Sequence, residues 1–288
     1  MLRRLLWLLL FSISTVLAFP ILHPRDADFT SVHTHLLTDH SNKHKDPADK
    51  YFHESTFHPH YDGRFTDRKL EEDKRRTALT YLMRTYLSTM VSIDVETWLA
   101  HGSLLGWYWN RRILAWDSDV DVQTDERGMK LLAAYYNMTV HHFDVPDQTD
   151  ETASKGKGRG RERGKGRNYL IEVNPHWTNA SVADKWNRID ARWIDTDTGL
   201  FIDITTLRHD SDAEKRNLKG WMYSKDKHQY REDEIFPLRE SVFEGMPVKV
   251  PFAYAELLEW EYGAKALAKA NVAGHHWERE RGEWRRIE

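Results

Sequence analysis

Three aspartates occupy alternate positions within residues 116–122: Asp117, Asp119 and Asp121. Alternate side chains of a β-strand project from the same face, so a strand here would bring the three carboxylates together. Clustered carboxylates repel one another unless a cation lies among them. Mg²⁺ and Mn²⁺ prefer oxygen ligands and commonly bind substrate phosphates in their remaining positions. The spacing therefore indicates a metal-dependent phosphoryl-transfer site.

A further acid, Asp203, lies within the hydrophobic segment 201–204. Burying an unpaired carboxylate is costly, so this side chain needs a partner. A metal ion shared with Asp119 and Asp121 would supply one, and Asp203 would then either hold the metal or accept the proton of an acceptor hydroxyl. The alternative is structural: Asp117 caps a turn, Asp121 faces water and Asp203 pairs with an arginine.

The residues before the acidic run also suggest a ligand site. His101, Gly102 and Ser103 form a predicted tight turn, for which glycine has the necessary backbone freedom. His101 either anchors this turn or acts in catalysis. Arg111 and Arg112 follow a short predicted helix, where they either clamp a phosphate or lie in a solvated loop.

Hydrophobic periodicity defines the elements that would position these residues. Apolar residues recur every three to four positions after residue 67, which predicts a long helix capped by Thr66 or Asp67. Strands are predicted where β-branched and aromatic residues gather between turn residues. The predicted helices cover 67–92, 104–110, 125–136 and 254–262, and the predicted strands cover 95–100, 119–123, 169–173, 189–195 and 200–205, the last two joined by a hairpin turn at 196–199.

This order predicts an α+β fold, with a nucleotidyltransferase-like mixed sheet flanked by helices and an irregular N-terminal arm. The arm is the polar, histidine-rich segment 19–66, whose histidines are expected to be solvated rather than metal-bound. The folded domain is expected to span 67–265 and to be followed by a charged, frayed tail at 266–288. A glycine- and arginine-rich insertion at 148–167 is expected to be disordered.

The N-terminus has features of a secretory signal. Two arginines precede the apolar run 5–11, and small residues follow up to Ala18, which fits a signal peptide at 1–18. If it is not cleaved, the segment 5–22 is just long enough to act as a signal anchor. Both alternatives place the rest of the chain in the secretory lumen, so the sequons at Asn137 and Asn179 are predicted glycosylation sites.

Composition narrows the function further. The chain has 288 residues and a net charge of -3 at pH 7, so no overall field recruits nucleic acid. It contains no cysteine, which excludes disulfides and thiolate metal sites. The basic insertion leaves RNA binding as a third, weaker possibility, which deletion of the insertion would test. A solvated loop, or one attracted to anionic glycans and membranes, fits a lumenal chain better. No nucleic-acid partner is expected.

The motif residues resemble those of a known family. The run 101–108 followed by 115–121 is similar to the core motif of the LicD/fukutin/fukutin-related family, which has His-Gly-Thr/Ser-Leu-Leu-Gly, a short helix, and Trp-Asp-x-Asp-x-Asp. The segments 50–54, 60–64, 108–110 and 189–195 resemble its fungal branch, which includes proteins needed for mannosylphosphate transfer to cell-wall glycans. The resemblance covers roughly residues 50–265. The sequence departs from it at Ser118, where an acid is common, at Arg112, where a glycine is common, and in the insertion.

The resemblance implies Asp119, Asp121, Asp203 and a plausible Asp117 as ligands of Mg²⁺ or Mn²⁺. It implies that the amides of Gly102 and Ser103 approach the phosphates of a nucleotide-sugar donor, with GDP-mannose as a candidate. It also implies a phosphosugar transferase that modifies a glycan acceptor in the Golgi, either secreted or membrane-anchored. The alternative is a non-catalytic Golgi regulator or scaffold that works with a partner glycosyltransferase.

Overall fold

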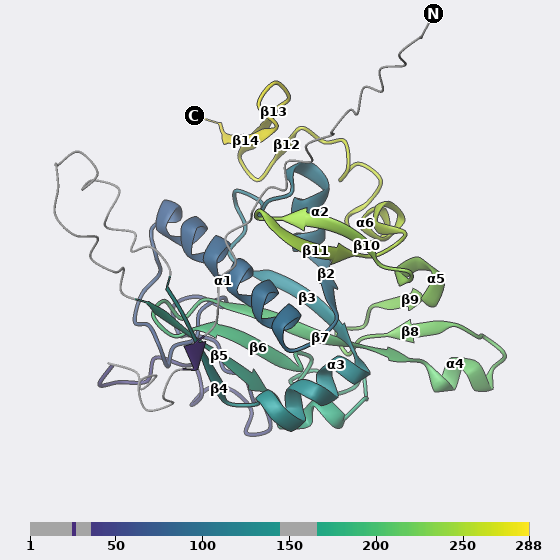
Figure 1. Ribbon diagram of the computed structural model, residues 1–288, viewed down its shortest axis with the longest axis horizontal. Helices are drawn as coiled ribbons and strands as arrows, with labels where there is room; N and C mark the ends of the chain where they lie inside the picture. Colours follow the sequence, from purple (N-terminus) through teal and green to yellow (C-terminus); the bar gives the residue numbers. More distant parts are fainter. Residues whose placement is uncertain (1–24, 27–35, 145–165, 288) are drawn as a thin grey trace, which may run out of the picture.

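The computed structural model describes residues 25–26, 36–144 and 166–287, which form a central sheet with helices around it (Figure 1). The strand order is β1-β4-β5-β6-β7-β3-β2, and β8 and β9 extend the sheet from the end of β7. β3 and β7 run parallel, whereas the β2–β3 and β6–β7 pairs are antiparallel. The predicted mixed sheet flanked by helices is therefore confirmed.

The strands of this sheet are β1 (Arg25–Asp26), β2 (Thr97–Leu99), β3 (Val120–Asp125), β4 (Thr139–Phe143), β5 (Arg167–Val173), β6 (Ala191–Asp195), β7 (Phe201–His209), β8 (Trp221–Tyr223) and β9 (Gln229–Arg231). The α-helices are α1 (Glu72–Ser92), α2 (His101–Asn110), α3 (Glu126–Leu131), α4 (Ser211–Lys215), α5 (Glu232–Ile235) and α6 (Tyr254–Tyr262), with a π-helical turn at Leu132–Tyr136 and a 3₁₀ turn at Pro175–Thr178. Two smaller sheets contain β10 (Arg239–Phe243) with β11 (Met246–Val250), and β12 (Asn271–Val272) with β13 (His275–Glu278) and β14 (Glu283–Arg286).

Helix α1 covers one face of the sheet. Its buried residues include Leu82 and Tyr86, which belong to the predicted apolar stripe, and they pack against Trp193 and Ile202 of β6 and β7. The indole N–H of Trp193 donates a hydrogen bond to Thr85 Oγ1 at 3.2 Å. This packing explains why the apolar period of the sequence is helical over this segment.

The predicted start of α1 is wrong. The helix begins at Glu72 rather than Asp67, and its N-cap residue Glu71 makes no side-chain cap. The hydroxyl of Thr66 instead donates to the carbonyl of Arg68 at 3.1 Å, so residues 66–71 form an irregular approach to the helix. Local capping signals identified a helix end here but misplaced it by about one turn.

Residues 36–66 of the arm pack across the opposite face of the sheet. Phe52 and Tyr61 are buried, and the backbone amide of Asp62 donates to the carbonyl of Gly199 at 2.7 Å. Gly199 has a φ of +73°, which suits glycine in the tight β6–β7 turn, and an added Cβ there would lie 2.6 Å from Thr66 Cγ2. The arm is therefore part of the folded structure and holds the β6–β7 turn.

The predicted frayed tail is corrected by the structure. Residues 271–286 contain the strands β12, β13 and β14 as a small antiparallel sheet. Trp284 of this sheet is buried, with its ring centroid 4.8 Å from that of Trp109 and 4.9 Å from that of Trp116. Charged residues occupy the surface of this sheet, whereas its tryptophans attach it to the end of α2 and the following loop.

A buried polar cluster lies at the start of β6. The Asp190 carboxylate is fully buried and lies 2.7 Å from Lys225 Nζ and 3.2 Å from Arg208 Nη1. It also accepts a hydrogen bond from the amide of Thr206 at 3.0 Å. One carboxylate is therefore shared by two buried cations, one from the β8–β9 turn and one from β7.

Several predictions concern residues outside the described ranges. The expected signal peptide or anchor at 1–18 lies outside them, and so does the insertion up to residue 165. Arg167 was assigned to the insertion but is the first residue of β5, where its Nη1 lies 3.1 Å from Asp195 Oδ2. Among the helices of the described ranges, none combines the length and apolar character that crossing a bilayer requires.

Candidate functional site

The acidic residues meet at the junction of β3 and β7. These strands are parallel neighbours, and Asp121 is directly opposite Asp203 in their register. Neighbouring strands lie about 4.8 Å apart, so side chains paired in this way share one face of the sheet. Asp119 precedes β3 by one residue and lies two residues before Asp121, and it borders the same pocket as Asp203. The structure thus brings the three acids together.

A row of alternating charge continues across the sheet from these acids. Arg192 of β6 is paired with Asp203, and Glu172 of β5 is paired with Arg192. The Arg192 side chain is 2% exposed, its Nε donates to Asp203 Oδ1 at 2.8 Å, and its guanidinium carbon lies 3.7 Å from the ring centroid of Phe201. The predicted alternative in which an arginine pairs with Asp203 is therefore part of the observed site.

The N-terminal arm forms a wall of this site. His60 Nδ1 lies 2.7 Å from Ser118 Oγ, and its Nε2 lies 3.5 Å from Asp119 Oδ2. Glu54 Oε1 lies 3.4 Å from Arg192 Nη2. A pocket of about 620 Å³ lies between the arm and the sheet, with Asp119, Arg192 and Asp203 among the residues that line it. The histidine-rich arm is therefore not wholly solvated, because His60 borders the acids.

The remaining predicted acid, Asp117, lies in the turn before β3 and faces the start of α2. A Cβ added to Gly102 would lie 3.0 Å from Asp117 Oδ2, so glycine leaves room for this carboxylate. The predicted turn at 101–103 is corrected here. Helix α2 begins at His101, and the left-handed residue is His101 itself, with a φ of 48°. Glycine at position 102 allows the Asp117 carboxylate to approach the helix, and its backbone freedom is not what this position requires.

Ser103 positions the acidic strand. Its hydroxyl is buried and accepts a hydrogen bond from the backbone amide of Asp121 at 2.9 Å. The N-cap residue of α2, Ala100, makes no side-chain cap, so the first-turn amides at 101–103 have no side-chain acceptor from it. The positive end of this ten-residue helix lies beside Asp117, where an anionic group is favoured.

Electrostatics at the site favour a cation. Burial, and then the nearby charges of Asp119 and Asp203, raise the pKa of Asp121, although His101 opposes this shift. Burial likewise raises the pKa of Asp203, against the lowering effect of Arg192. Burial and the adjacent Asp119 raise the pKa of Asp117. These carboxylates resist ionisation because they are buried and close together. A bound Mg²⁺ or Mn²⁺ would offset their negative charge, so the residues fit such an ion.

The side chain of His101 belongs to a neighbouring cluster. Its Nδ1 lies 2.8 Å from Glu261 Oε1, and its Nε2 lies 3.1 Å from Asp226 Oδ2. Burial alone would lower the pKa of this imidazole, but the hydrogen bonds to both carboxylates raise it to about 10. The ring anchors the start of α2 through these contacts, which agrees with the anchoring alternative considered above.

The two predicted phosphate-binding arginines lie elsewhere. Arg111 is the C-cap residue of α2, about 15 Å along the helix axis from His101. Its guanidinium lies 4.0 Å from the ring centroid of Trp107. Arg112 lines a separate hollow with Glu244 and Trp284. The structure therefore does not bring either arginine together with the acids.

Both predicted glycosylation sites are exposed. Asn137 lies in the turn before β4, where its Oδ1 accepts from the amide of Val173 at 2.9 Å. Asn179 follows the 3₁₀ turn at Pro175–Thr178. Neither side chain belongs to the acid cluster. Glycosylation of these two asparagines stays a prediction.

Sequence reasoning missed Arg192, Glu54 and His60 as site residues. The signal for Arg192 was its place in the predicted strand 189–195, where a charge among apolar residues needs a partner, as Asp203 does. Glu54 and His60 gave no such signal, because their position depends on how an irregular segment crosses the sheet.

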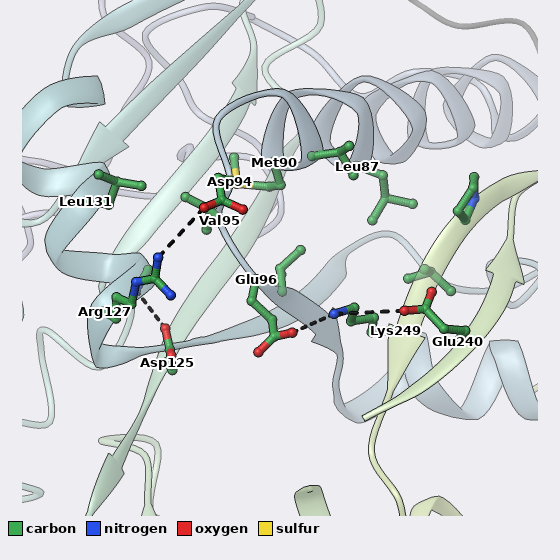
Figure 2. A pocket seen from close by; sticks show the side chains of 15 residues that line it. Leu87, Met90, Asp94, Val95, Glu96, Asp125, Arg127, Leu131, Glu240 and Lys249 are labelled. Carbon is green, nitrogen blue, oxygen red and sulfur yellow. Dashed lines mark hydrogen bonds and ion pairs between the residues drawn. The ribbon is translucent and has the colours of Figure 1, made fainter. Parts of the chain in front are cut away.

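A second hollow of about 360 Å³ lies at the other end of β3, near Asp125. Figure 2 shows its apolar side chains, including Leu87 and Met90, together with the ion pairs that border them. Lys249 Nζ bonds Glu96 Oε1 at 2.6 Å in this rim. The acids discussed above are not among its lining residues, so we assign it no part in the candidate site.

The mixed sheet and its in-register acids define a domain of the nucleotidyltransferase type. Residues 94–253 match the family described as LicD/FKTN/FKRP, nucleotidyltransferase domain, and the chain belongs to this family. The resemblance stated from the motif is therefore confirmed. The matched range contains Asp119, Asp121 and Asp203, whereas Glu54 and Glu261 lie outside it.

Two yeast proteins are also similar to the chain. Mannosyltransferase regulator 4 of Saccharomyces cerevisiae is 29% identical over 194 residues, which cover 66% of this chain and 15% of that protein. Mannosyltransferase regulator 14 of the same organism is 27% identical over 190 residues, covering 63% of this chain and 18% of that protein. The chain thus spans less than a fifth of the length of either relative.

Proposed function

We propose that the chain is a metal-dependent phosphosugar transferase that moves a sugar phosphate, with mannose phosphate as the leading candidate, from a nucleotide-activated donor to a secretory-pathway glycan. The single observation that carries this proposal is the register of Asp121 and Asp203 on adjacent parallel strands, with Asp119 beside them at a pocket. Membership of the LicD/FKTN/FKRP nucleotidyltransferase family supports it. The yeast relatives are named mannosyltransferase regulators, which supports mannose as the sugar that is transferred.

Asp119, Asp121 and Asp203 would hold Mg²⁺ or Mn²⁺, with Asp117 as a further ligand. The bound ion would polarise the donor diphosphate and offset the charge of the leaving nucleotide. Arg192 engages Oδ1 of Asp203, which leaves Oδ2 for the ion or for the proton of the acceptor hydroxyl.

Other residues of the chain would orient the substrates. The first-turn amides of α2 at Gly102 and Ser103 would offer the positive end of the helix dipole to donor phosphates. Arg192 borders the pocket, and its buried Nη1 makes no hydrogen bond within the described residues, so a phosphoryl oxygen that reached it would satisfy this donor. The acceptor hydroxyl would attack the phosphorus that bears the sugar, and the nucleoside monophosphate would leave.

The direct test is product analysis with purified protein. We expect incubation with Mn²⁺, a mannan acceptor and GDP-mannose to release GMP and to add mannose phosphate to the acceptor, and EDTA to prevent both. A panel of other nucleotide-sugars identifies the donor. Acceptor-dependent release of GDP instead of GMP would contradict the proposal, because it would show transfer of mannose without its phosphate.

A second candidate function is a non-catalytic regulator or scaffold for a partner glycosyltransferase. The observation that favours it is that both yeast relatives are named mannosyltransferase regulators. Calorimetric titration separates the two functions, because a transferase binds Mn²⁺ and a nucleotide-sugar, whereas a pure scaffold binds neither. A chain that binds neither ligand and still raises the activity of a partner transferase would establish the second function.

The compartment is part of the proposal: the secretory lumen, and the Golgi in particular. We expect the full chain expressed in a yeast host to carry N-glycans at Asn137 and Asn179, since both side chains are exposed. Partial endoglycosidase digestion should lower its apparent mass in two steps, one for each glycan. Asn137→Gln and Asn179→Gln should each remove one of these steps. An unmodified chain from that host would count against a lumenal location.

A further inference from the structure

Two histidines and two carboxylates converge beside the start of α2. His101 opens that helix, Asp226 and His228 lie in the turn between β8 and β9, and Glu261 lies near the end of α6. One ligand atom from each of His101, His228 and Glu261 lies within 4.8 Å of the other two. Three separate segments of the chain therefore bring imidazole and carboxylate groups to one point.

Each imidazole is held between the same two carboxylates. On one side, Glu261 Oε1 lies 2.8 Å from His101 Nδ1 and 3.8 Å from His228 Nε2. On the other side, Asp226 Oδ2 lies 3.1 Å from His101 Nε2 and 3.1 Å from His228 Nδ1. Asp226 thus faces the far nitrogen of both rings at ion-pair distance, the position of a carboxylate behind metal-bound histidines, although neither nitrogen makes a well-aligned hydrogen bond within the described residues.

Two arrangements give this cluster of side chains a net charge of zero. Two imidazolium ions would neutralise Asp226 and Glu261, but their ring centroids lie 4.4 Å apart and like charges at that distance repel. One divalent cation bound to two neutral imidazoles and Glu261 gives the same net charge without this repulsion. The side chains of His101 and His228 are only 12% and 24% exposed, which increases the cost of the first arrangement.

We propose that His101, His228 and Glu261 bind a Zn²⁺ ion, with Asp226 as the supporting carboxylate. Two imidazoles and one carboxylate are a donor set that Zn²⁺ uses in proteins, with a fourth position left open. The acid cluster around Asp119 offers only oxygen ligands and suits Mg²⁺ or Mn²⁺ instead. The two sites thus differ in ligand chemistry and in the metal that they select.

The Zn²⁺ site would hold α2 in place beside the acids. It would join His101 to α6 and to the β8–β9 turn, and Gly102, the next residue, leaves room for Asp117. An added Cβ at Gly102 would also lie 4.0 Å from the hydroxyl of Tyr262, the residue after Glu261. Bound Zn²⁺ would therefore rigidify the helix N-terminus without belonging to the acid cluster.

The test uses the full chain, stripped of metal with a chelator and titrated with Zn²⁺ alone. We expect one tightly bound equivalent, a higher melting temperature, and visible d–d absorption bands when Co²⁺ replaces Zn²⁺. His228→Gln and Glu261→Gln should each weaken Zn²⁺ binding at least tenfold and abolish the Co²⁺ bands. Asp226→Asn should weaken binding about 10- to 100-fold, as loss of a supporting carboxylate does.

Two controls locate the effect. His209→Gln removes an exposed histidine at the end of β7 and should bind Zn²⁺ as the wild type does. Asp119→Asn should also retain the Zn²⁺ site, which separates this inference from the proposed transferase metal. A wild-type chain that takes up no tightly bound Zn²⁺ overturns the proposal, whether or not the variants fold. So does a tight site that survives both His228→Gln and Glu261→Gln in folded protein.

Discussion

Asp121→Asn is expected to lower the rate of sugar-phosphate transfer at least about a thousandfold, because a metal ligand contributes several kcal/mol of transition-state stabilisation. Asparagine has the shape of aspartate but lacks the charge that would attract a divalent cation. Asp121 lies opposite Asp203 on the adjacent strand, and its backbone amide donates to Ser103 at the start of α2. The measurement is GMP release from GDP-mannose, together with Mn²⁺ affinity by calorimetry.

The same variant should remain folded. In metal-free protein the charge of Asp121 is crowded by Asp119 and Asp203, so its removal relieves repulsion, and the urea midpoint should not fall. Asp94→Asn is the matched control, because Asp94 is exposed in a left-handed turn position that asparagine tolerates. Transfer at the wild-type rate by folded Asp121→Asn would show that Asp121 takes no part in the mechanism. Unchanged Mn²⁺ affinity would show that it is not a metal ligand.

Asp190→Ala is expected to lower the free energy of unfolding by about 3–5 kcal/mol, because it leaves two buried cations without their shared carboxylate. Lys225 is 0% exposed and Arg208 is 4% exposed at the side chain. The variant also loses the acceptor for the amide of Thr206. Urea unfolding followed by tryptophan fluorescence measures the change.

Asp212→Ala is the control for this prediction. Asp212 pairs with Lys215 at 2.8 Å, but both side chains are exposed, and exposed pairs contribute little to stability. Its unfolding midpoint should match that of the wild type. If Asp190→Ala unfolds at the wild-type midpoint as well, the buried cluster does not stabilise the fold as its geometry indicates.

The acids of the site were predictable because strand geometry is local. The period of two along a strand places Asp119 and Asp121 together, and a lone acid in the apolar segment of Asp203 requires a partner. The sequence does not determine which strands are neighbours, since the pairing of β3 with β7 joins distant segments. The register that sets Asp121 opposite Asp203 therefore became known only from the structure.

Errors occurred where tertiary packing outweighs local preference. Helix α2 begins three residues before the predicted position, at His101, whose ring contacts two carboxylates from distant segments. The tail was expected to fray because it is highly charged. Trp277 and Trp284 nevertheless pack against Trp109, with ring centroids 5.0 Å and 4.8 Å from it, and give the tail its order.

The placement of the arm limits how the chain can be divided. Residues 94–253 are the part that matches the family, yet His60 reaches Asp119 and Glu54 reaches Arg192 from before this range. Glu261 reaches α2 from beyond it. A fragment trimmed to the shared residues would expose Arg192 to water and leave His101 without one of its carboxylates. Fragments for activity assays or for domain exchange therefore need both flanking segments. The part of the chain that must be kept together is larger than the part that matches the family.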